Sequence, residues 1–551
     1  MNYACDFETT TEKEDCRVWA AGIYEIESGA FNWMTNIKDF MEYVYTLGSC
    51  KLYFHNLKFD GEFILYYLLT NGFKYVEEVT PKNSKEFSTN IGEFGQFYSI
   101  TIRYKRALIR IWDSLKVLPM KIEEMPKAFG LDIEKLGLDY TKKRDEKYIV
   151  SDEELKYLYN DCKILALSLQ HLFNMGLTSI TLASNAFRDF KKDFTAKEYA
   201  RLFPPPYYDS DMRQAYKGGY VYVNPKFKNK KINSGIVLDV NSMYPWAMKF
   251  CNLPYGEPIY FEGKYEYDEV YCLYIQQFVC RFKLKKGKLP MIQIKGNLYR
   301  FNPTEYLDNS GDQEVCLTLT NIDLKLFLEC YEIIGEIEYI AGWKFKGTIG
   351  LLGKYVDRWY SLKQEATRDK NTALRTIAKL MLNSLYGKFA VNPKVRSKYP
   401  ILYDNTIKYV EGEINDREPI YIPIAAFITS YARDKLIRAA LNNLDRFIYC
   451  DTDSLHLIGE EIPDGLELDD IKLGAFKIES KFTSAKFIRA KTYIEIIRGE
   501  KHIKCAGMPA NLYEQVSFNN FRPGAEYEGK LRPIHVPGGI VLEPTVFTIR
   551  G

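Results

Sequence analysis

Residues 449–457 read YCDTDSLHL, in which two acidic residues interrupt an apolar run that extends from 447 to 458. If this run forms one β-strand, its side chains alternate between the two faces, so Asp451 and Asp453 point to the same side. Like charges held this close repel each other, and their burial is unfavourable unless something neutralises them. The stretch therefore predicts a cation site that needs a further ligand from elsewhere in the chain.

A second apolar segment, SGIVLDVNSMYPWAM at 234–248, offers that ligand. It reads as a strand that ends at Asp239 and continues into a turn. If this strand pairs beside the one that holds Asp453, Asp239 completes a carboxylate site for a divalent cation. The alternative is that these acids are strand-end residues that face water.

The segment ALRTIAKLMLNSLYGKFA at 373–390 has helical periodicity and carries two separate stripes. The apolar stripe, which is expected to pack on the protein body, consists of Ile377, Met381 and Leu385. The other stripe falls within one quarter of the helical wheel and consists of Arg375, Lys379, Asn383 and Tyr386. Two cations, an amide and an aromatic ring suit a triphosphate and a base.

The N-terminal third contains its own acidic residues on two predicted elements. YACDFETTT at 3–11 reads as a strand with Asp6 and Glu8 on one face. KLYFHNLKFDGEFILYYLL at 51–69 reads as a strand, a short loop and an apolar helix that begins near Asp60.

A third predicted element is the helix SDEELKYLYNDCKILALSL at 151–169. Ser151 and Glu154 form a predicted capping box at its start. Tyr157 and Asp161 are four residues apart and share a face.

Taken together, the four carboxylates Asp6, Glu8, Asp60 and Asp161 suit two divalent cations, with Tyr157 orienting a water molecule. Two such ions clamp the attacking and leaving oxygens of a phosphodiester, and hard oxygen ligands favour Mg²⁺ or Mn²⁺. Taken alone, each motif has a simpler alternative. The acid pair on the strand could be surface residues, and the Tyr–Asp pair on the helix could form an ordinary hydrogen bond.

The motifs in this order resemble known families. The N-terminal set resembles the DEDDy class of 3′–5′ exonucleases. DVNSMYP, KLMLNSLYGKFA and YCDTDS resemble motifs A, B and C of family B DNA polymerases, and the detail resembles the protein-primed phi-29 phage type. YKGGYV at 216–221 is similar to the YxGG motif of that family, and KTY at 491–493 is similar to its KxY motif.

The resemblance implies roles for individual residues. Asp239, the Val240 carbonyl and Asp453 would hold two catalytic ions with Asp451 close by, and Tyr244 would lie beneath the incoming sugar and exclude a 2′-hydroxyl. The nucleotide contacts would include Lys363, Lys379, Asn383 and Tyr386. Lys491 and Tyr493 would steady the primer terminus, and Lys135 would serve the exonuclease site. The positions that match DNA-binding residues are Thr9, Tyr53, His55, Asn56, Phe59, Ser114, Leu115, Tyr140, Tyr216, Gly218 and Gly219.

The implied fold class is a multidomain α/β and α+β protein: an RNase H-like 3′–5′ exonuclease followed by a right-hand polymerase with two terminal-protein-region insertions. The predicted domains are the exonuclease (1–180), the palm (181–252 and 419–522), terminal-protein region 1 (253–352), the fingers (353–391), the terminal-protein region 2 hairpin (392–418) and the thumb (523–551).

The composition and net charge of the whole chain are compatible with such an enzyme but do not by themselves indicate one. The net charge is only +3, and the 11 cysteines form no CxxC pair, which favours a reduced setting such as the cytoplasm of an infected host cell. Zinc is not expected, because the 5 histidines form no HxxxH pattern. No apolar run reaches the roughly 18–20 residues that span a bilayer, and no signal peptide is expected.

We therefore expect a DNA-directed DNA polymerase with proofreading, two Mg²⁺ or Mn²⁺ ions per active site, and strand displacement on a linear viral genome. The expected partners are primer-template and single-stranded DNA, dNTPs and a terminal protein that supplies the priming hydroxyl, the chain being a monomer or a heterodimer with that protein. The alternatives are an RNA-synthesising or reverse-transcribing polymerase, a non-catalytic replication scaffold, and ordinary RNA-primed synthesis.

Overall fold

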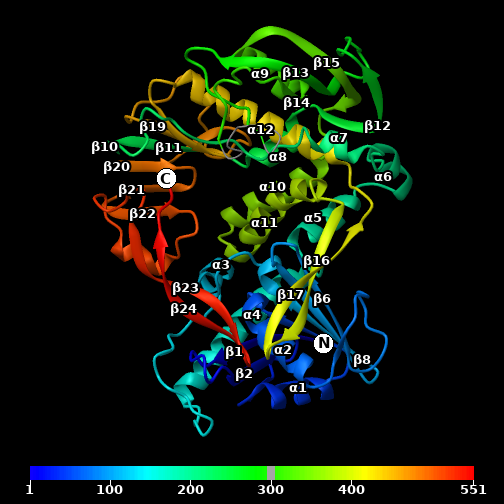
Figure 1. Ribbon diagram of the computed structural model, residues 1–551, viewed down its shortest axis with the longest axis vertical. Coiled ribbons are helices and arrows are strands. Elements are labelled where there is room, and N and C mark those ends of the chain that lie inside the picture. The colour runs from blue at the N-terminus through cyan, green and yellow to red at the C-terminus, as the bar shows by residue number, and fades with distance from the viewer. Residues whose placement is uncertain (295–304) are drawn as a thin grey trace.

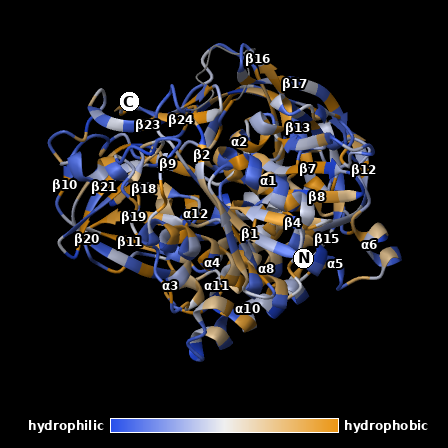
Figure 2. Cartoon of the chain, turned by 90° about the horizontal axis from the view of Figure 1, so that it is seen from below, coloured by the Kyte–Doolittle hydropathy of each residue, from blue (hydrophilic) through white to orange (hydrophobic). Residues whose placement is uncertain are grey.

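The computed structural model describes residues 1–294 and 305–551, and its strands form three sheets and two long hairpins in this part of the chain (Figure 1). Two of the sheets have eight strands each, and the third has four. The ten residues 295–304, which fall within predicted terminal-protein region 1, lie outside the described part. Hydrophobic residues concentrate in the sheets and in the helix faces packed on them (Figure 2). No helix in the described ranges is long and apolar enough to cross a membrane.

The first sheet belongs to the N-terminal unit, with strand order β3-β2-β1-β4-β8-β7-β6-β5. Its strands are β1 (Asn2–Thr9), β2 (Val18–Glu25), β3 (Phe31–Met34), β4 (Cys50–Phe54), β5 (Lys74–Tyr75), β6 (Glu86–Ile91), β7 (Phe97–Tyr104) and β8 (Ala107–Asp113). The helical elements of this unit are α1 (Ile37–Thr46), α2 (Leu57–Thr70), α3 (Met125–Phe129), α4 (Asp152–Asn174) and the short 3₁₀ turns η1 (Ser114–Lys116) and η2 (Ile122–Glu124).

Both faces of the central strand β1 are covered, because its residues alternate between two apolar cores. Ala4 packs in the core that contains α4, whereas Phe7 packs in the core that contains α1 and α2. Helix α4 lies close to the sheet: a Cβ on Gly22 of β2 would come within 2.8 Å of Cys162 Sγ. The α4 capping box between Ser151 and Glu154 is present as predicted. Helix α2 begins at Leu57, three residues before the predicted start, so Asp60 lies in its first turn.

The second eight-stranded sheet is the palm sheet, with order β22-β21-β20-β11-β19-β18-β9 and β10 paired to β20. Its strands are β9 (Val221–Val223), β10 (Lys231–Ile232), β11 (Gly235–Val240), β18 (Phe447–Asp451), β19 (Ser454–Ile458), β20 (Phe476–Arg489), β21 (Thr492–Ile497) and β22 (Glu500–Cys505). The accompanying helices are α8 (Met243–Phe250) and α12 (Ile422–Asn442), with a 3₁₀ turn η3 (Ala510–Gln515) further along the chain.

The prediction of one continuous strand through Asp451 and Asp453 is wrong. The segment is a hairpin, in which β18 ends at Asp451 and β19 begins at Ser454. Thr452 turns the chain with φ of +61°, a backbone region that β-branched residues rarely occupy. The amide of Asp453 donates to the carbonyl of Asp451 at 2.6 Å across this three-residue turn. The two acids are therefore held together by a tight turn and not by strand alternation.

The four-stranded sheet, order β12-β15-β13-β14, covers the outer end of the palm (Figure 1). It comprises β12 (Leu253–Glu262), β13 (Leu273–Leu284), β14 (Val315–Thr320) and β15 (Tyr331–Thr348), with α9 (Asn321–Cys330) beside them. Helices α10 (Gly353–Arg368) and α11 (Thr372–Phe389) pack against each other, and α5 (Leu182–Lys191) packs on α11. Two short helices, α6 (Ala196–Leu202) and α7 (Asp209–Arg213), lead into the palm.

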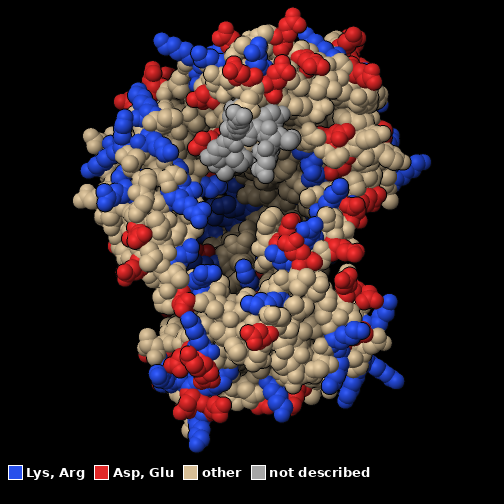
Figure 3. All heavy atoms as spheres, in the orientation of Figure 1, with Lys and Arg blue, Asp and Glu red and all other residues tan. Residues whose placement is uncertain are grey.

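Two hairpins reach the N-terminal unit from the rest of the molecule (Figure 1). The first, β16 (Lys394–Tyr403) and β17 (Thr406–Asp416), confirms that 392–418 forms a hairpin. The second is β23 (Glu526–Val536) and β24 (Gly539–Thr548) near the C-terminus. Both contact α2, so the chain surrounds a central hollow, with Lys and Arg side chains gathered on the hollow's wall on the palm side (Figure 3).

Candidate functional site

The palm sheet brings Asp239 and Asp453 together, as the sequence predicted. Strand β11 pairs antiparallel with β19, with Asp239 opposite Ser454, and the amide of Val240 donates to the Asp453 carbonyl at 2.8 Å. Burial, followed by the charges of Asp239 and Asp451, raises the pKa of Asp453 to about 6. Like charges thus converge in a half-buried place, the electrostatic signature of a cation site.

Asp451 has a different set of partners from the other two acids. Lys491 Nζ lies 3.3 Å from its carboxylate, and the Tyr449 hydroxyl donates to it at 3.2 Å. The same hydroxyl accepts from the Lys491 amide at 3.0 Å, which links the predicted KxY segment to the acidic hairpin. Tyr493 lies in the adjoining aromatic cluster, 5.3 Å from the Tyr449 ring.

Helix α11 presents its predicted polar stripe to this site. Its apolar stripe is buried, and Arg375, Lys379 and Asn383 are exposed. Lys363 on α10 joins them: burial, then the charges of Lys477, Lys379 and Arg375, lowers its pKa to about 8. The Asp239 charge opposes this lowering, which places Lys363 beside the acids.

Two tyrosines lie at the site, one on α8 and the other on α11. The rings of Tyr244 and Tyr386 stack with centroids 4.0 Å apart. Tyr244 follows Ser242, which has φ of +51° and starts α8 sharply after the Asp239 strand. The turn thus places an aromatic ring next to the acids that the preceding strand supplies.

The YKGGYV segment packs directly on the acidic hairpin. The Tyr220 carbonyl accepts from the Thr452 amide at 2.8 Å. A Cβ on Gly219 would come within 2.7 Å of Thr452 Oγ1, so the absence of a side chain there permits the close approach. Tyr216 is half-buried against the same core that Tyr244 and Tyr386 contact, whereas a Cβ on Gly218 would meet nothing within 4 Å.

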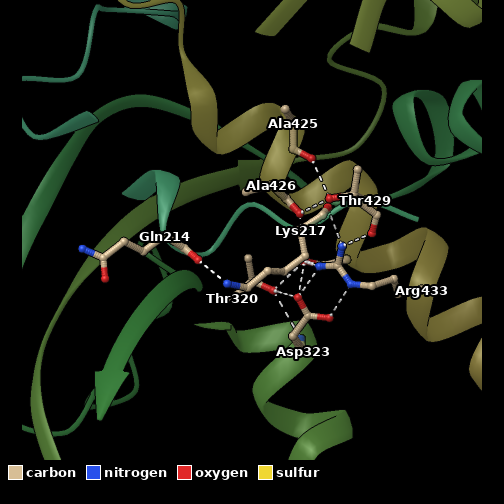
Figure 4. A network of polar contacts seen from close by, with 10 residues as sticks. Gln214, Lys217, Thr320, Asp323, Ala425, Ala426, Thr429 and Arg433 are labelled. Atoms are coloured by element: carbon tan, nitrogen blue, oxygen red, sulfur yellow. Dashed lines mark hydrogen bonds and ion pairs between the residues drawn. The ribbon is translucent and has the colours of Figure 1, made fainter. Parts of the chain in front are cut away.

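A buried ion pair that the sequence analysis missed anchors this segment. Arg433 of α12 donates to the carbonyls of Lys217 and Gly218 at 2.7 and 2.8 Å and pairs with Asp323 of α9 at 2.5 Å (Figure 4). The Thr429 hydroxyl, one turn earlier, donates to the helix carbonyls of Ala425 and Ala426. Asp323 and Arg433 each lie in a helix that carries other charged residues as well, so nothing in the sequence singles them out.

The N-terminal carboxylates converge as well. Ligand oxygens of Asp6, Glu8 and Asp161 all lie within 4.8 Å of one another. Asp60 is outside this tightest group, but its charge acts on both Asp6 and Glu8. Burial first, and then neighbouring acids, raises the pKa of Glu8 to about 8 and that of Asp6 well above its usual range. Burial raises the pKa of Asp60 to about 7.

Lys135 and two tyrosines organise the rim of this second site. Lys135 Nζ donates to Asp161 Oδ2 at 2.5 Å and to the Tyr157 hydroxyl at 3.1 Å. The Tyr157 hydroxyl in turn lies 3.1 Å from that of Tyr140. Asp161 Oδ1 is buried and has no hydrogen-bond partner among the described residues, which leaves it available to a cation.

A groove beside the second site is lined by several residues predicted to hold single-stranded DNA. They include His55, Asn56 and Leu115, and Lys135, which is predicted to serve the exonuclease site, also lines the groove. Asn56 adopts φ of +70°, and its amide donates to Asp113 at 3.0 Å, so the buried Asp113, which the sequence analysis missed, sets the entry to α2. The His55 ring nitrogen Nε2 donates to the Met120 carbonyl at 2.8 Å, and Nδ1 lies 3.0 Å from Ser114 Oγ.

The other N-terminal positions predicted to bind DNA differ in their exposure. Thr9 and Tyr140 line one small neighbouring pocket. Phe59 packs partly buried beside Phe63. Tyr53 is buried against Trp112 and Phe173, so its contact with a bound strand stays a prediction.

Lys477 is a further site residue that the sequence analysis missed. It lies on β20 directly opposite Asp239 of β11, and its Nζ is 3.2 Å from Asp239 Oδ2. A lysine in an alternating strand is ordinarily a solvent-facing residue, and nothing local to 476–489 indicates which strand it pairs with. Its position became visible only through the pairing of two segments about 240 residues apart.

The palm sheet carries converging acids and is faced by a cationic helix, and a separate unit holds a second carboxylate site. This combination defines a nucleic-acid polymerase with an accessory site. A family model described as DNA polymerase type B, organellar and viral, matches residues 44–153 and 138–469. The DNA polymerase of Bacillus phage phi29 is 42% identical over 577 residues, covering 100% of this chain and 99% of the relative. That of Streptococcus phage Cp-1 is 32% identical over 579 residues, covering 100% and 98%.

Solved structures agree. The phi29 DNA polymerase complexed with primer-template DNA and incoming nucleotide substrates matches with a TM-score of 0.93 at 42% identity, with 100% of both chains covered. The same polymerase complexed with single-stranded DNA also matches with a TM-score of 0.93. The chain therefore belongs to the organellar and viral type B DNA polymerases. Within them it is a DNA polymerase of the protein-primed phi29 phage type, with an exonuclease-type domain before the polymerase domain.

Proposed function

We propose that the chain extends primer-template DNA with dNTPs at the palm site and removes mispaired 3′ ends at a separate N-terminal 3′–5′ exonuclease site. The observation that carries this proposal is that carboxylates converge twice, in the palm and in the N-terminal sheet. The phi29 structures with primer-template DNA, incoming nucleotides and single-stranded DNA support the same partners here.

The donor sets suit hard divalent ions at both sites. Asp239, the Val240 carbonyl and Asp453 would hold Mg²⁺ or Mn²⁺ in the palm, and Asp6, Glu8, Asp60 and Asp161 would hold two ions in the exonuclease. The unpartnered, buried Asp161 Oδ1 and the raised pKa values of the acids fit such occupancy. Bound ions lower the pKa of the attacking oxygen and stabilise charge on the leaving group in an in-line displacement.

Side chains of the protein would bind the nucleotide and the primer strand and orient the attacking water. Lys363, Lys379 and Asn383 would bind the triphosphate, and Lys491 and Tyr493 would steady the primer strand. In the exonuclease, Lys135 fixes Asp161 and the Tyr157 hydroxyl, which would orient the attacking water. The groove that contains His55, Asn56 and Leu115 would hold the frayed single strand.

Initiation from a terminal-protein hydroxyl, strand displacement on a linear viral genome, and action in the infected host's cytoplasm belong to the same proposal. The four-stranded sheet of β12–β15 and the β16–β17 hairpin support it, because they correspond to the two predicted insertions. The test of priming is transfer of one deoxynucleotide from a dNTP to purified terminal protein. If the protein extends only nucleic-acid primers, ordinary RNA-primed synthesis explains its role better than protein priming does.

Separate inactivation tests the two sites. Asp453→Ala should abolish primer extension and keep degradation of single-stranded DNA, whereas Asp6→Ala with Glu8→Ala should do the reverse. Loss of both activities in either variant would contradict two independent sites. A natural chain that fails Mg²⁺-dependent primer extension would instead be a non-catalytic scaffold.

A further inference from the structure

Lys477 occupies a position to which the proposed chemistry assigns no role. It is directly opposite Asp239 across the β11–β20 pairing, and antiparallel partners share a face of the sheet. Its ammonium is 3.2 Å from Asp239 Oδ2, and its side chain is 36% exposed. The residue therefore lies at the edge of the catalytic acids with its side chain partly exposed.

The surroundings of Lys477 are rich in positive charge. The charges of Lys477, Lys379 and Arg375 all act on Lys363, and no described acidic residue forms an ion pair with Lys363, Lys379 or Arg375. Lys477 is the member of this group that has a carboxylate partner. Four cations that converge around one aspartate indicate a site built for an anion with several charges.

The Lys477–Asp239 pair is incompatible with the proposed use of Asp239. When a divalent ion takes the Asp239 oxygens, an ammonium 3.2 Å away faces a cation and is repelled. Neighbouring oxygens around an octahedral Mg²⁺ ion lie about 3 Å apart. A phosphate that shares an ion with Asp239 is thus within reach of a flexible lysine that already touches Asp239.

We propose that Lys477 is a nucleotide-binding residue that neutralises Asp239 in the empty palm site and transfers its contact to the triphosphate when a nucleotide and its divalent ion bind. The proposal rests on nucleotidyl transfer at the Asp239–Asp453 site. The proposal gives a positioning and binding role to a residue of strand β20. This strand is separate from helices α10 and α11, which supply Lys363 and Lys379. The proposal predicts that nucleotide affinity, rather than DNA affinity, depends on Lys477.

The experiment measures equilibrium binding of the correct dNTP to full-length polymerase on a primer-template whose primer lacks the 3′-hydroxyl, so that no chemistry follows. Lys477→Met removes the charge at similar length, and Lys477→Arg keeps it. Lys481→Met is the matched control, because Lys481 lies on the same strand, opposite Ile236, and pairs with Glu460 at 2.8 Å. Thermal unfolding of each variant shows whether the fold is kept.

Lys477→Met should weaken dNTP binding by about tenfold, which corresponds to about 1.4 kcal/mol, at both low and saturating Mg²⁺. Lys477→Arg should recover most of the affinity, and Lys481→Met and primer-template binding should be unchanged. If Lys477→Met binds dNTP equally well, or more tightly at low Mg²⁺, the lysine merely competes with the metal and the proposal is overturned. Absence of Mg²⁺-dependent dNTP binding in the natural chain would overturn the palm-site function itself, a distinguishable result.

Discussion

The Tyr409 hydroxyl donates a hydrogen bond of 2.8 Å to Glu62 Oε1, which joins the β16–β17 hairpin to α2 across 347 residues of sequence. His535 of the C-terminal hairpin lies 3.2 Å from the same oxygen. Glu62 is 2% exposed. A single buried carboxyl group thus bonds to the first hairpin and lies within ion-pair distance of the second.

Tyr409→Phe should loosen this contact, because it removes one hydrogen bond to a buried carboxyl group while the ring remains. We expect a local loss of about 1–3 kcal/mol, seen as faster amide hydrogen exchange in both hairpins. Tyr403→Phe is the control, since Tyr403 is exposed at the hairpin end. Unchanged exchange in Tyr409→Phe would show that apolar contacts alone hold the hairpins.

Gly219→Ala should slow nucleotide incorporation by about tenfold or more, since the added Cβ would lie 2.7 Å from Thr452 Oγ1 and displace the turn between Asp451 and Asp453. Single-turnover extension measures the effect. Adding Thr452→Ala removes the two nearest atoms and should restore part of the rate. A double variant no faster than Gly219→Ala would place the defect elsewhere.

Glu8→Gln should stabilise the metal-free protein near neutral pH. Burial and the Asp161 charge raise the pKa of Glu8 from 4.5 to about 8, so the folded state retains a proton that the unfolded chain loses. The natural chain's stability contribution from this group is full below pH 4.5 and is lost as the pH rises to about 8. Melting temperatures without metal should therefore fall between these values in the natural chain and fall less in Glu8→Gln.

Divalent ions should reverse the difference in melting temperature between the natural chain and Glu8→Gln. Mn²⁺ or Mg²⁺ should raise the melting temperature of the natural chain at pH 8 and have a smaller effect on Glu8→Gln, because the amide is a poorer ligand for these ions. Equal metal-induced shifts in both proteins would contradict Glu8 as a ligand.

Tyr244→Val should admit ribonucleotides, because the stacked Tyr244–Tyr386 pair would lose the ring that is expected to lie beneath the sugar. We expect discrimination against ribonucleotides to fall by about 10–200-fold, the range for one steric contact. The ratio of kcat/KM for dNTP and rNTP measures it. Tyr244→Phe keeps the ring and should keep the discrimination.

Local patterns predicted the elements that carry the acids. The α4 capping box and the buried stripe of α11 depend on residues three or four positions apart, so the sequence alone contains them. The turn at Thr452 was missed because it lacks Gly and Pro and is imposed by contacts with Gly219 and Tyr220. Family resemblance, more than periodicity, located Lys135, Lys363 and Tyr244.

Contacts between distant segments could not be predicted. Lys477 meets Asp239 only because β20 and β11 pair, and Glu62 meets Tyr409 and His535 only because two hairpins reach α2. Each of these residues reads as an ordinary surface charge or aromatic ring in its own segment. Strand pairing over long separations is a property of the whole fold, which local propensity does not encode.

The tip of the last hairpin has a further consequence for how the protein is made. Val536, Ile540 and Val541 are buried in the same core as Phe63 and Phe54, and a Cβ on Gly538 would come within 1.9 Å of the Cys16 carbonyl. Residues of the β23–β24 hairpin therefore complete the packing of a core that a much earlier part of the chain supplies. Until this hairpin has been synthesised and has docked, the N-terminal unit keeps part of its apolar surface uncovered.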